Sequence, residues 1–343
     1  MRLYQANGYL DMASIRRAGY PFTIVINGRG TGKTFNGLYD LLSSGTKFIY
    51  LRRTQTQIDQ IRVPGLDPFS DINRKMGTTY IQAPMTKKTT AIYNGQVVDG
   101  ELKPAGEPLG YLAALSTFAT MRGIADTSID AMFFDEFIPE WNERPIREEY
   151  QTLKQALETI GRNRELEGRK PLQLIAVANS NTIANPILVG MGIVEKVVKM
   201  VKNKSQVLTI PERGIMVVCP TESPISAAKR NTALYKLDSD EFSDMVLGNI
   251  FPEFSNSKIK SLPLQEHRPL CRVGEITIYQ HKANGTIYVS THTQPTPYTY
   301  GVSDVELERF NNDFRMLSRL YLSNDIIFQT QTAEMLFRTY TQK

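Results

Sequence analysis

Four short apolar runs recur in the first half of the chain. They read PFTIVI (21–26), KFIYLRR (47–53), IDAMFFDE (129–136) and LQLIAVANS (172–180). Nearly continuous apolar runs of this length are typical of strands that are buried on both faces, as in a parallel sheet. The stretches between them can hold helices, so the pattern predicts an α/β fold with a mostly parallel sheet.

The segment that starts at Pro145 predicts an amphipathic helix. Proline suits the first turn of a helix, and Gly161 or Gly168 lies near the expected end. One helical face is apolar and consists of Ile146, Tyr150, Leu153, Leu157 and Ile160. The opposite face is polar and consists of Arg147, Gln151, Lys154, Glu158 and Arg162. We expect the apolar face to pack inward.

The rest of the chain divides by changes in pattern. Turn pairs at Asn94-Gly95 and Asp99-Gly100 predict a β-hairpin insertion in which Lys87 and Lys88 are exposed. A proline-punctuated, helical stretch predicts a lid or linker over 209–252, after a first, α/β domain over 1–208. The last part, 253–343, predicts a small α+β domain, with two strands around Asn284-Gly285 and a helix that Ser303 and Glu306 cap.

Composition narrows the possible classes only slightly. A chain of 343 residues with 41% hydrophobic content can bury a sizeable core, and 40 basic against 35 acidic side chains give weak support for a polyanionic partner. Cys219 and Cys271 form no paired motif, which argues against a disulfide framework or a cysteine zinc site and indicates a reducing compartment. The pattern shows neither a signal peptide nor a membrane span, so we expect a soluble intracellular protein.

The stretch INGRGTGKT (26–34) predicts a phosphate-binding loop. A loop that curls around an anion needs converging backbone N–H groups, and the glycines at 28, 30 and 32 reach such conformations without steric cost. The helix that starts near Lys33 adds its N-terminal N–H groups, Lys33 reaches the outer phosphates, and the Thr34 hydroxyl binds Mg²⁺. We therefore expect ATP to be held by residues 27–34, namely Asn27, Gly28, Arg29, Gly30, Thr31, Gly32, Lys33 and Thr34.

Asn27 departs from the usual G-x-x-x-x-G-K-[ST] pattern, in which its position is the first glycine. Asparagine tolerates a left-handed backbone better than most residues, and Gly28 lies next to it. We therefore expect the substitution to be accommodated in the loop.

Two further strand ends complete the predicted site. AMFFDEF ends a strand in Asp135, which is expected to hold Mg²⁺, and Glu136, which is expected to polarise the attacking water. LIAVANSN ends the next strand in Asn179, Ser180 and Asn181, and Asn179 is expected to sense the γ-phosphate. An ordinary strand-end turn gives the same letters, so this last interpretation stays open.

With these motifs the sequence resembles the bacteriophage DNA-packaging ATPases of the large-terminase class, and most of all the phi29-like packaging motors. The matching segments are INGRGTGKT, FIYLRR, MFFDEF, ETIGRNR, VANSNTIANP and DMVLGNIF. The resemblance implies a P-loop ATPase fold of the additional-strand, catalytic-glutamate type. It also implies a homopentameric ring that docks on the procapsid portal in the host cytoplasm and translocates double-stranded DNA; whether a scaffold RNA takes part is left open.

The resemblance also implies roles for basic residues. In this family an arginine completes the ATP site of the neighbouring subunit, and ETIGRNR matches that segment at Arg162, with Arg164 as the alternative. Arg122 matches a second basic position that can act across the interface, although a solvated loop arginine fits equally well. Lys87 and Lys88 are candidates for contact with the DNA backbone, and Arg52 and Arg53 for phosphate or interface contacts.

The C-terminal domain resembles a ribonuclease-H-like nuclease in outline, but its predicted first strand, ITIYQHK, carries no acid. A two-metal nuclease needs several converging carboxylates. We therefore expect a degenerate domain that does not cut DNA. Two alternatives remain: a terminase with an active nuclease, and a phage assembly or secretion ATPase that remodels protein and does not bind DNA.

Overall fold

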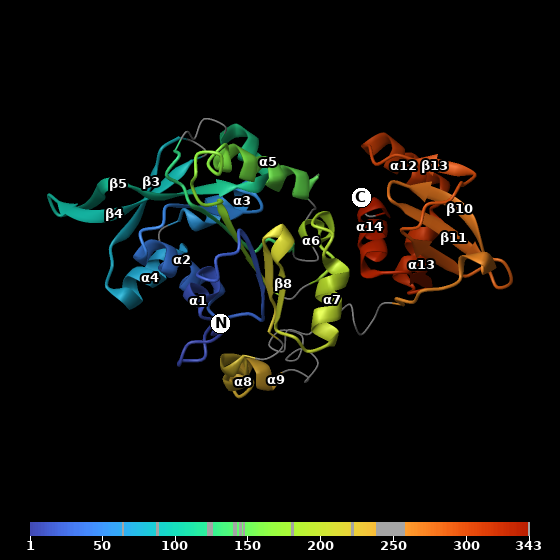
Figure 1. Cartoon of the computed structure of the whole chain (residues 1–343), viewed down its shortest axis with the longest axis horizontal. Coiled ribbons are helices and arrows are strands. Elements are labelled where there is room, and N and C mark those ends of the chain that lie inside the picture. Colours follow the sequence, from blue (N-terminus) through green and yellow to red (C-terminus); the bar gives the residue numbers. More distant parts are fainter. Residues whose placement is uncertain are drawn as a thin grey trace. The chain divides into compact units, whose positions relative to one another are not determined.

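A computed structural model describes residues 1–63, 65–86, 89–121, 126–139, 143, 146, 148–179, 182–220, 223–237 and 258–341 (Figure 1). The chain forms two compact units, one of Met1–Asn181 with Met200–Ile250 and one of Thr182–Lys199 with Phe251–Lys343. Over the described ranges, no helix is both long enough and apolar enough to cross a membrane.

The first unit is built on a sheet of nine strands in the order β3-β4-β5-β2-β6-β7-β1-β9-β8. The four predicted strands are present as β1 (Phe22–Ile26), β2 (Phe48–Arg52), β6 (Ala131–Asp135) and β7 (Gln173–Ala178). They pair in parallel with one another, and β2 and β1 continue the parallel pairing with β5 and β9 on either side. The predicted α/β class with a mostly parallel sheet is therefore confirmed.

Sequence analysis did not identify two parallel strands of this sheet. β5 (Glu101–Ala114) pairs with β2 through its apolar end, and β9 (Ile215–Val218) pairs with β1. β8 (Val207–Ile210) adds an antiparallel edge beside β9. The expected boundary at 208/209 thus falls inside β8, and β9, at 215–218, belongs to the sheet although it lies within the segment expected as a lid. The helical part of that segment includes α8 (Pro224–Lys229) and α9 (Ala233–Leu237).

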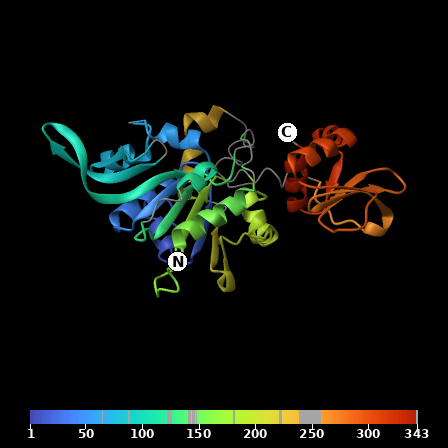
Figure 2. The same ribbon diagram turned by 90° about the horizontal axis from the view of Figure 1, so that it is seen from above.

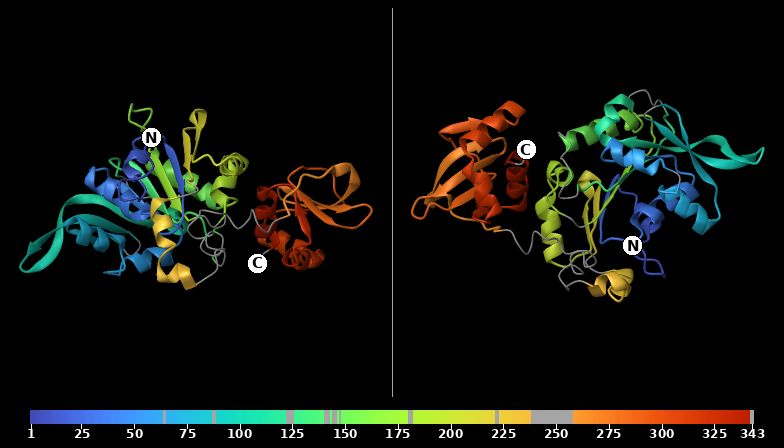
Figure 3. Two further views of the ribbon diagram at one scale, coloured as in Figure 1. Left: turned by 90° about the horizontal axis from the view of Figure 1, so that it is seen from below. Right: turned by 180° about the vertical axis from the view of Figure 1, so that it is seen from behind.

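Four helices share a core with one face of the sheet: α1 (Met12–Arg16), α2 (Lys33–Ser43), α3 (Gln55–Ile61) and α4 (Pro68–Met76) (Figure 3). α3 follows β2 and contributes Ile58. Side chains on both faces of β1 are buried, as in a parallel sheet that is covered on both sides. At one helix the contact is very close, since a Cβ on Gly37 of α2 would lie 2.4 Å from the Phe133 ring of β6.

β3 (Tyr80–Pro84) and β4 (Thr90–Val98) form the antiparallel end of the sheet, and the β4–β5 ribbon extends away from the rest of its unit (Figure 2). The predicted hairpin is confirmed at Asp99 and Gly100, which both have positive φ. The second predicted turn, at Asn94 and Gly95, is wrong. Gly95 lies inside β4, where a Cβ would meet the Thr79 carbonyl oxygen at 2.7 Å, so glycine serves a close backbone approach and not a turn.

The predicted amphipathic helix is α5 (Glu149–Gly161); Pro145, its expected start, lies outside the described residues. Its buried face includes Leu153 and Ile160, as predicted, together with Glu149, which was not expected. The fully buried Arg53 explains this, because its Nε and Nη2 donate to the two Glu149 carboxylate oxygens at 2.7 and 3.1 Å. This bidentate pair joins the end of β2 to the start of α5.

The second unit contains a separate five-stranded sheet in the order β13-β10-β11-β12-β14. Its strands are β10 (His267–Val273), β11 (Ile276–His281), β12 (Ile287–Ser290), β13 (Tyr298–Tyr300) and β14 (Ile326–Phe328). Its helices are α6 (Pro186–Gly190), α7 (Val194–Lys202) as far as Lys199, α12 (Asp304–Asp313), α13 (Met316–Leu322) and α14 (Gln331–Thr341). The β11–β12 hairpin was predicted, whereas the single helix expected over 303–323 is split at Phe314, which leaves helical geometry.

β10, which sequence analysis missed, precedes the strand that was expected to come first. Neither β10 nor β11 contains an aspartate or glutamate, and the described residues include no group of three or more acidic, histidine or cysteine side chains that could hold a metal ion. The ribonuclease-H-like outline and the loss of nuclease chemistry remain predictions.

Gly37→Ala provides a test of how tightly α2 is held against β6. The added methyl group has no room beside the Phe133 ring, so we expect the free energy of unfolding to fall by about 1–3 kcal/mol in chemical denaturation. Gly161→Ala is the matched control, because a Cβ there meets Leu172 only at 3.9 Å and alanine favours the helix. Equal stability of the two variants would contradict this packing.

Candidate active site

The predicted site residues meet at one edge of the sheet. β1, β7, β6 and β2 are parallel neighbours, so their carboxyl ends lie side by side, and Asp135 on β6 is level with Val177 on β7. The loop after β1, the acids at the end of β6, and Asn179 after β7 therefore share one crevice. This edge is where open α/β sheets bind ligands.

The loop after β1 takes a form suited to an anion. Gly30 and Gly32 have φ of 70° and 86°, which side chains rarely adopt, whereas Asn27 and Gly28 do not have positive φ. The expectation that Asn27 fits through a left-handed backbone is therefore wrong. Its N–H donates to the Ala178 carbonyl at 3.2 Å, which extends the β1–β7 pairing, and its Oδ1 accepts from the Gly28 N–H at 2.8 Å.

Lys33 begins α2, directly after Gly32, and its side chain is buried. Its ammonium group donates to the carbonyl oxygens of Asn27 and Gly28 at 2.8 and 2.7 Å and to Asn179 Oδ1 at 3.1 Å. Burial lowers the pKa of Lys33 from its ordinary value of 10.5 to about 7, against the opposing effect of the acids at the end of β6. The lysine is thus a desolvated cation at the base of the loop, and an anion would stabilise its charged form.

Thr34 and Asp135 provide oxygen ligands next to the loop. The Thr34 hydroxyl donates to the two Asp135 carboxylate oxygens at 3.0 and 3.2 Å. Asp135 also accepts from the Tyr50 hydroxyl at 2.7 Å and from Arg52 Nη1 at 2.9 Å, so its orientation is fixed by β2. Burial and the adjacent carboxylate raise the pKa of Tyr50, which keeps its hydroxyl a donor.

Glu136 lies at the mouth of the site. Its side chain is about half exposed and accepts from Arg52 Nη2, while its backbone has a φ of 53°. A non-glycine residue in this conformation costs about 1–3 kcal/mol and is often found at functional sites. The turn of the chain directs Glu136 toward the cavity, whereas Asp135 remains buried beside Thr34.

A cavity of about 380 Å³ lies over these groups and is lined by Arg29, Gly30, Thr31, Gly32, Lys33, Thr34, Phe35, Asp135, Glu136, Ala178 and Asn179. Its donors come from the loop, Lys33 and Thr34, and its carboxylates are those of Asp135 and Glu136. A magnesium-bound phosphate group fits this set, because Mg²⁺ typically takes one or two carboxylates, a hydroxyl and phosphate oxygens from the protein and its substrate. Thr34 and Asp135 are the residues that would hold the metal.

Sequence analysis missed one group that contacts the loop. Lys229, at the end of α8, donates to the Arg29 carbonyl at 3.1 Å, and its ammonium lies 1.8 Å from the position of a Cβ on Gly30. Glycine at 30 is therefore needed for this approach as well as for its φ. Partial burial lowers the pKa of Lys229, which favours an anion beside it. No local pattern marks this residue, because the contact joins positions 200 residues apart.

The arginines predicted to act at the site differ in exposure and in hydrogen-bond partners. Arg162 is exposed at the end of α5, where its Nε donates to the Thr159 carbonyl at 3.2 Å. Arg164 is buried; its Nη1 donates to the Ile129 carbonyl at 2.7 Å and its Nη2 pairs with Asp130. This arrangement disfavours Arg164 as a group that reaches a neighbour. Arg53 is enclosed in its own subunit, contrary to the phosphate or interface contact considered for it.

Five residues named in the sequence analysis cannot be placed in this way. Arg122, Lys87 and Lys88 lie outside the described residues, as do Ser180 and Asn181 beyond the β7 end. The proposed roles of the three basic residues remain predictions.

Comparison with known structures agrees with this fold. The solved structure described as the phi-28 gp11 DNA packaging motor is 17% identical and covers 98% of this chain and 99% of that chain, with a TM-score of 0.62. The bacteriophage phi-29 viral genome packaging motor assembly is 18% identical and covers 97% and 99%, with a TM-score of 0.63. No curated protein matches the sequence significantly.

The family comparison covers most of the sequence. The profile of the podovirus DNA encapsidation protein (Gp16) family matches residues 11–325, a range that includes the loop, both acids, Asn179 and most of the second unit. Because this match extends over far more than half of the 343 residues, the chain belongs to the podovirus DNA encapsidation protein family, as its resemblance to the phi29-like packaging ATPases predicted.

Proposed function

We propose that this protein is an ATP-hydrolysing motor that moves double-stranded viral DNA into a procapsid, with hydrolysis at the interfaces of a homo-oligomeric ring. The observation that carries the proposal is the convergence of the Lys33 ammonium, the Thr34 hydroxyl and the two acids at one sheet edge. β7 lies between β1 and β6, which supports a P-loop fold of the additional-strand type. Family membership supports DNA as the cargo.

In this mechanism the chain binds the triphosphate mainly through its backbone. The N–H groups of the loop and of the first turn of α2 surround the phosphates, and Lys33 exchanges carbonyl partners for phosphate oxygens. Mg²⁺, held by Thr34 and Asp135, would neutralise charge on the phosphates. Tyr50 and Arg52 keep Asp135 in place during this exchange.

Glu136 is the group placed to orient the attacking water. Its pairing with Arg52 lowers its basicity, so loosening of this contact would make the carboxylate a better acceptor for a proton from the attacking water. Asn179, bonded to Lys33, is placed to detect the γ-phosphate through that lysine. The loop–Lys229 contact gives a physical route from the loop to α8.

Arg162 is the candidate that completes a neighbouring site. It is exposed and leaves the end of α5, at the amino-terminal edge of the sheet, away from its own subunit's loop. It therefore serves catalysis only if a second subunit presents a loop to it. We propose a ring on this basis. Family membership supports a portal partner, and the phi29-like size of five subunits is the expected one.

A protein-remodelling ATPase would use the same nucleotide site, so the site alone does not choose between the two functions. Duplex DNA should raise ATP turnover of the motor and leave that of a remodelling enzyme unchanged. The measurement is steady-state ATP hydrolysis with and without duplex DNA at several protein concentrations. DNA cleavage with Mn²⁺ would instead favour the active-nuclease alternative.

The lowered pKa of Lys33 predicts proton uptake when ATP binds. Near pH 8 the unbound lysine is mostly neutral, and phosphate raises its pKa, so binding should take up close to one proton. Calorimetric titration in two buffers of different ionisation enthalpy measures this number. At pH 6 the lysine is already charged, so the uptake should vanish; uptake that is equal at both pH values would contradict the assignment.

Glu136→Gln should separate binding from hydrolysis. The amide cannot accept a proton from the attacking water, so we expect turnover to fall by about 100-fold or more. Magnesium-ATP affinity should stay within about twofold. Nucleotide titration and phosphate release measure the two quantities. Glu165→Gln, at an exposed glutamate, should change neither; full turnover in the Glu136 variant would exclude its proposed role.

Arg162→Ala should reduce turnover only in assembled protein. Loss of an arginine supplied by a neighbour costs about 10³-fold or more in rate, whereas ATP binding by an isolated subunit should be unchanged. Mixing this variant with Lys33→Ala protein should restore part of the turnover. In mixed rings, some interfaces join the intact loop of an Arg162→Ala subunit to the intact Arg162 of a Lys33→Ala subunit. Lys154→Ala, on the same exposed face, is the control. Unchanged turnover would move the role to another arginine.

A further inference from the structure

A second cavity, of about 770 Å³, opens at the opposite edge of the sheet in the first unit. Four of its lining residues directly precede strands or lie within two positions of them: Pro21, Thr46, Asp130 and Pro171 come before β1, β2, β6 and β7. Because these strands are parallel, their amino ends lie on the far side from the nucleotide loop. The nucleotide site and this cavity are therefore separate.

The cavity is strongly basic. Its cationic lining consists of Arg16, Arg17, Arg164, Arg169 and Lys170. Asp130 is the one carboxylate among the described residues that line it. Like charges gathered in a concave site repel one another and concentrate positive potential, so an anionic ligand would stabilise the arrangement.

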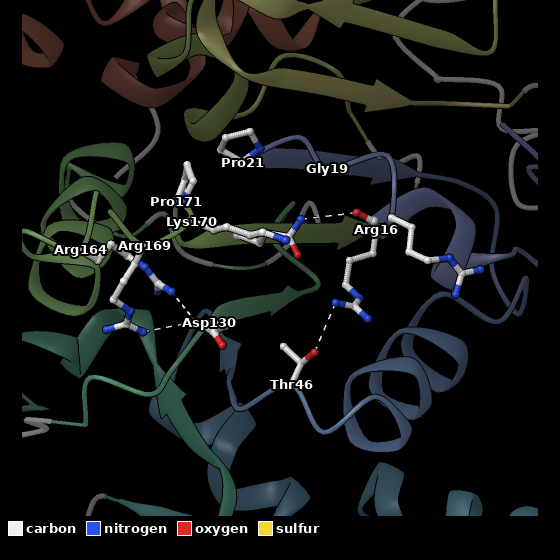
Figure 4. A pocket seen from close by; sticks show the side chains of 11 residues that line it. Arg16, Gly19, Pro21, Thr46, Asp130, Arg164, Arg169, Lys170 and Pro171 are labelled. Carbon is white, nitrogen blue, oxygen red and sulfur yellow. Dashed lines mark hydrogen bonds and ion pairs between the residues drawn. The ribbon is translucent and has the colours of Figure 1, made fainter. Parts of the chain in front are cut away.

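Two of the arginines form a fixed wall around Asp130 (Figure 4). Arg164 is buried, with 5% of its surface exposed, and Arg169 Nη2 lies 3.5 Å from the same Asp130 oxygen that Arg164 contacts. Arg164 Nε is buried and has no hydrogen-bond partner in the described part of the chain. One carboxylate shared by two guanidinium groups leaves donors and positive charge uncompensated at this wall.

Arg16 forms the facing wall (Figure 4). Its Nε pairs with Asp40 at 2.5 Å, and its Nη1 and Nη2 donate to the hydroxyls of Thr46 and Ser44 at 3.3 and 3.1 Å. The side chain is thus held in place while two of its five N–H donors stay available. At the rim, Arg17 and Lys170 are exposed and have no ion-pair partner among the residues that the structure describes.

We propose that this cavity binds the phosphodiester backbone of a nucleic acid, independently of the nucleotide site. Guanidinium groups held by internal contacts and with free N–H donors match phosphate oxygens, and the exposed rim cations extend the contact along a charged strand. The lining offers no aromatic ring for base stacking, among its described residues, so recognition is of the backbone and not of sequence. This proposal rests on the proposed function, which supplies a nucleic acid as the partner.

The test uses full-length protein and two fluorescein-labelled probes, a DNA duplex and an RNA duplex of the same sequence, in anisotropy titrations. The double variant Arg17→Glu/Lys170→Glu reverses the exposed rim charges and leaves the buried wall intact. We expect its affinity to fall by about tenfold or more, and the slope of log K against log salt to fall by about two, one for each lost phosphate contact. Loss on one probe alone identifies DNA or RNA as the ligand.

Lys196→Glu/Lys199→Glu is the matched control, because it makes the same change in net charge at two exposed lysines of α7. An equal loss of affinity in the control, or unchanged binding by the rim variant, would overturn the site. A rim variant that binds nucleic acid normally but no longer assembles in sedimentation would instead identify a contact between subunits. If the native protein binds neither probe, the proposed motor function fails, and magnesium-ATP binding by the rim variant reports that the fold is intact.

Discussion

The nucleotide site depends on one buried ammonium group. Lys33 starts α2 at the end of a loop whose carbonyl oxygens point inward, and these carbonyls together with Asn179 are its hydrogen-bond acceptors. Desolvation lowers its pKa to about 7, so its charge costs the unliganded fold stability that is recovered as pH rises from about 7 toward 10.5. A bound triphosphate would reverse this balance, because it would supply negative charge next to the desolvated ammonium group. The loop conformation, the position of Asn179 and the need for phosphate thus follow from the same desolvated cation.

The parallel sheet gives that cation its setting and separates two kinds of chemistry. At the carboxyl edge, acids and an ammonium group line a small cavity, and Thr34 and Arg52 donate to internal acceptors: Thr34 to Asp135, and Arg52 to both acids. Ligand binding there would exchange these internal contacts for contacts with the ligand. A change in the ligand, such as loss of a phosphate group, could therefore move the paired side chains. At the amino edge, cations exceed carboxylates and remain only partly paired. A ligand at that edge adds contacts without breaking the internal pairs, which favours holding a polyanion over responding to one.

The sequence was sufficient where a property is local. Apolar runs located four parallel strands, and the GKT and DE motifs located the loop and the acids, because each depends on neighbouring residues. It failed where a contact joins distant segments. The pair Asn94-Gly95 is typical of a turn, but Gly95 allows a close backbone approach to Thr79. Arg53 was expected to be available for an external contact, but it is paired with Glu149. Lys229 reaches the loop from 200 residues away, and no spacing rule could connect them. Even Asn27, correctly placed in the loop, fits for a different reason: it extends a strand pair and caps the next N–H.

The two ends of α5 link these observations. Its first turn carries Glu149, which fixes Arg53 directly after the β2 residues that hold the acids, and its last turn leads to Arg162 and the Arg164–Asp130 wall. Burial of the Arg53–Glu149 pair makes this connection rigid, because separating the two charges in a dry environment would be very costly. A displacement of β2 when Arg52 releases Glu136 would therefore be carried along α5 to the opposite edge of the sheet. The helix that ends at the exposed Arg162 is thus mechanically tied to the acids of its own site, a coupling that the role proposed for Arg162 would use.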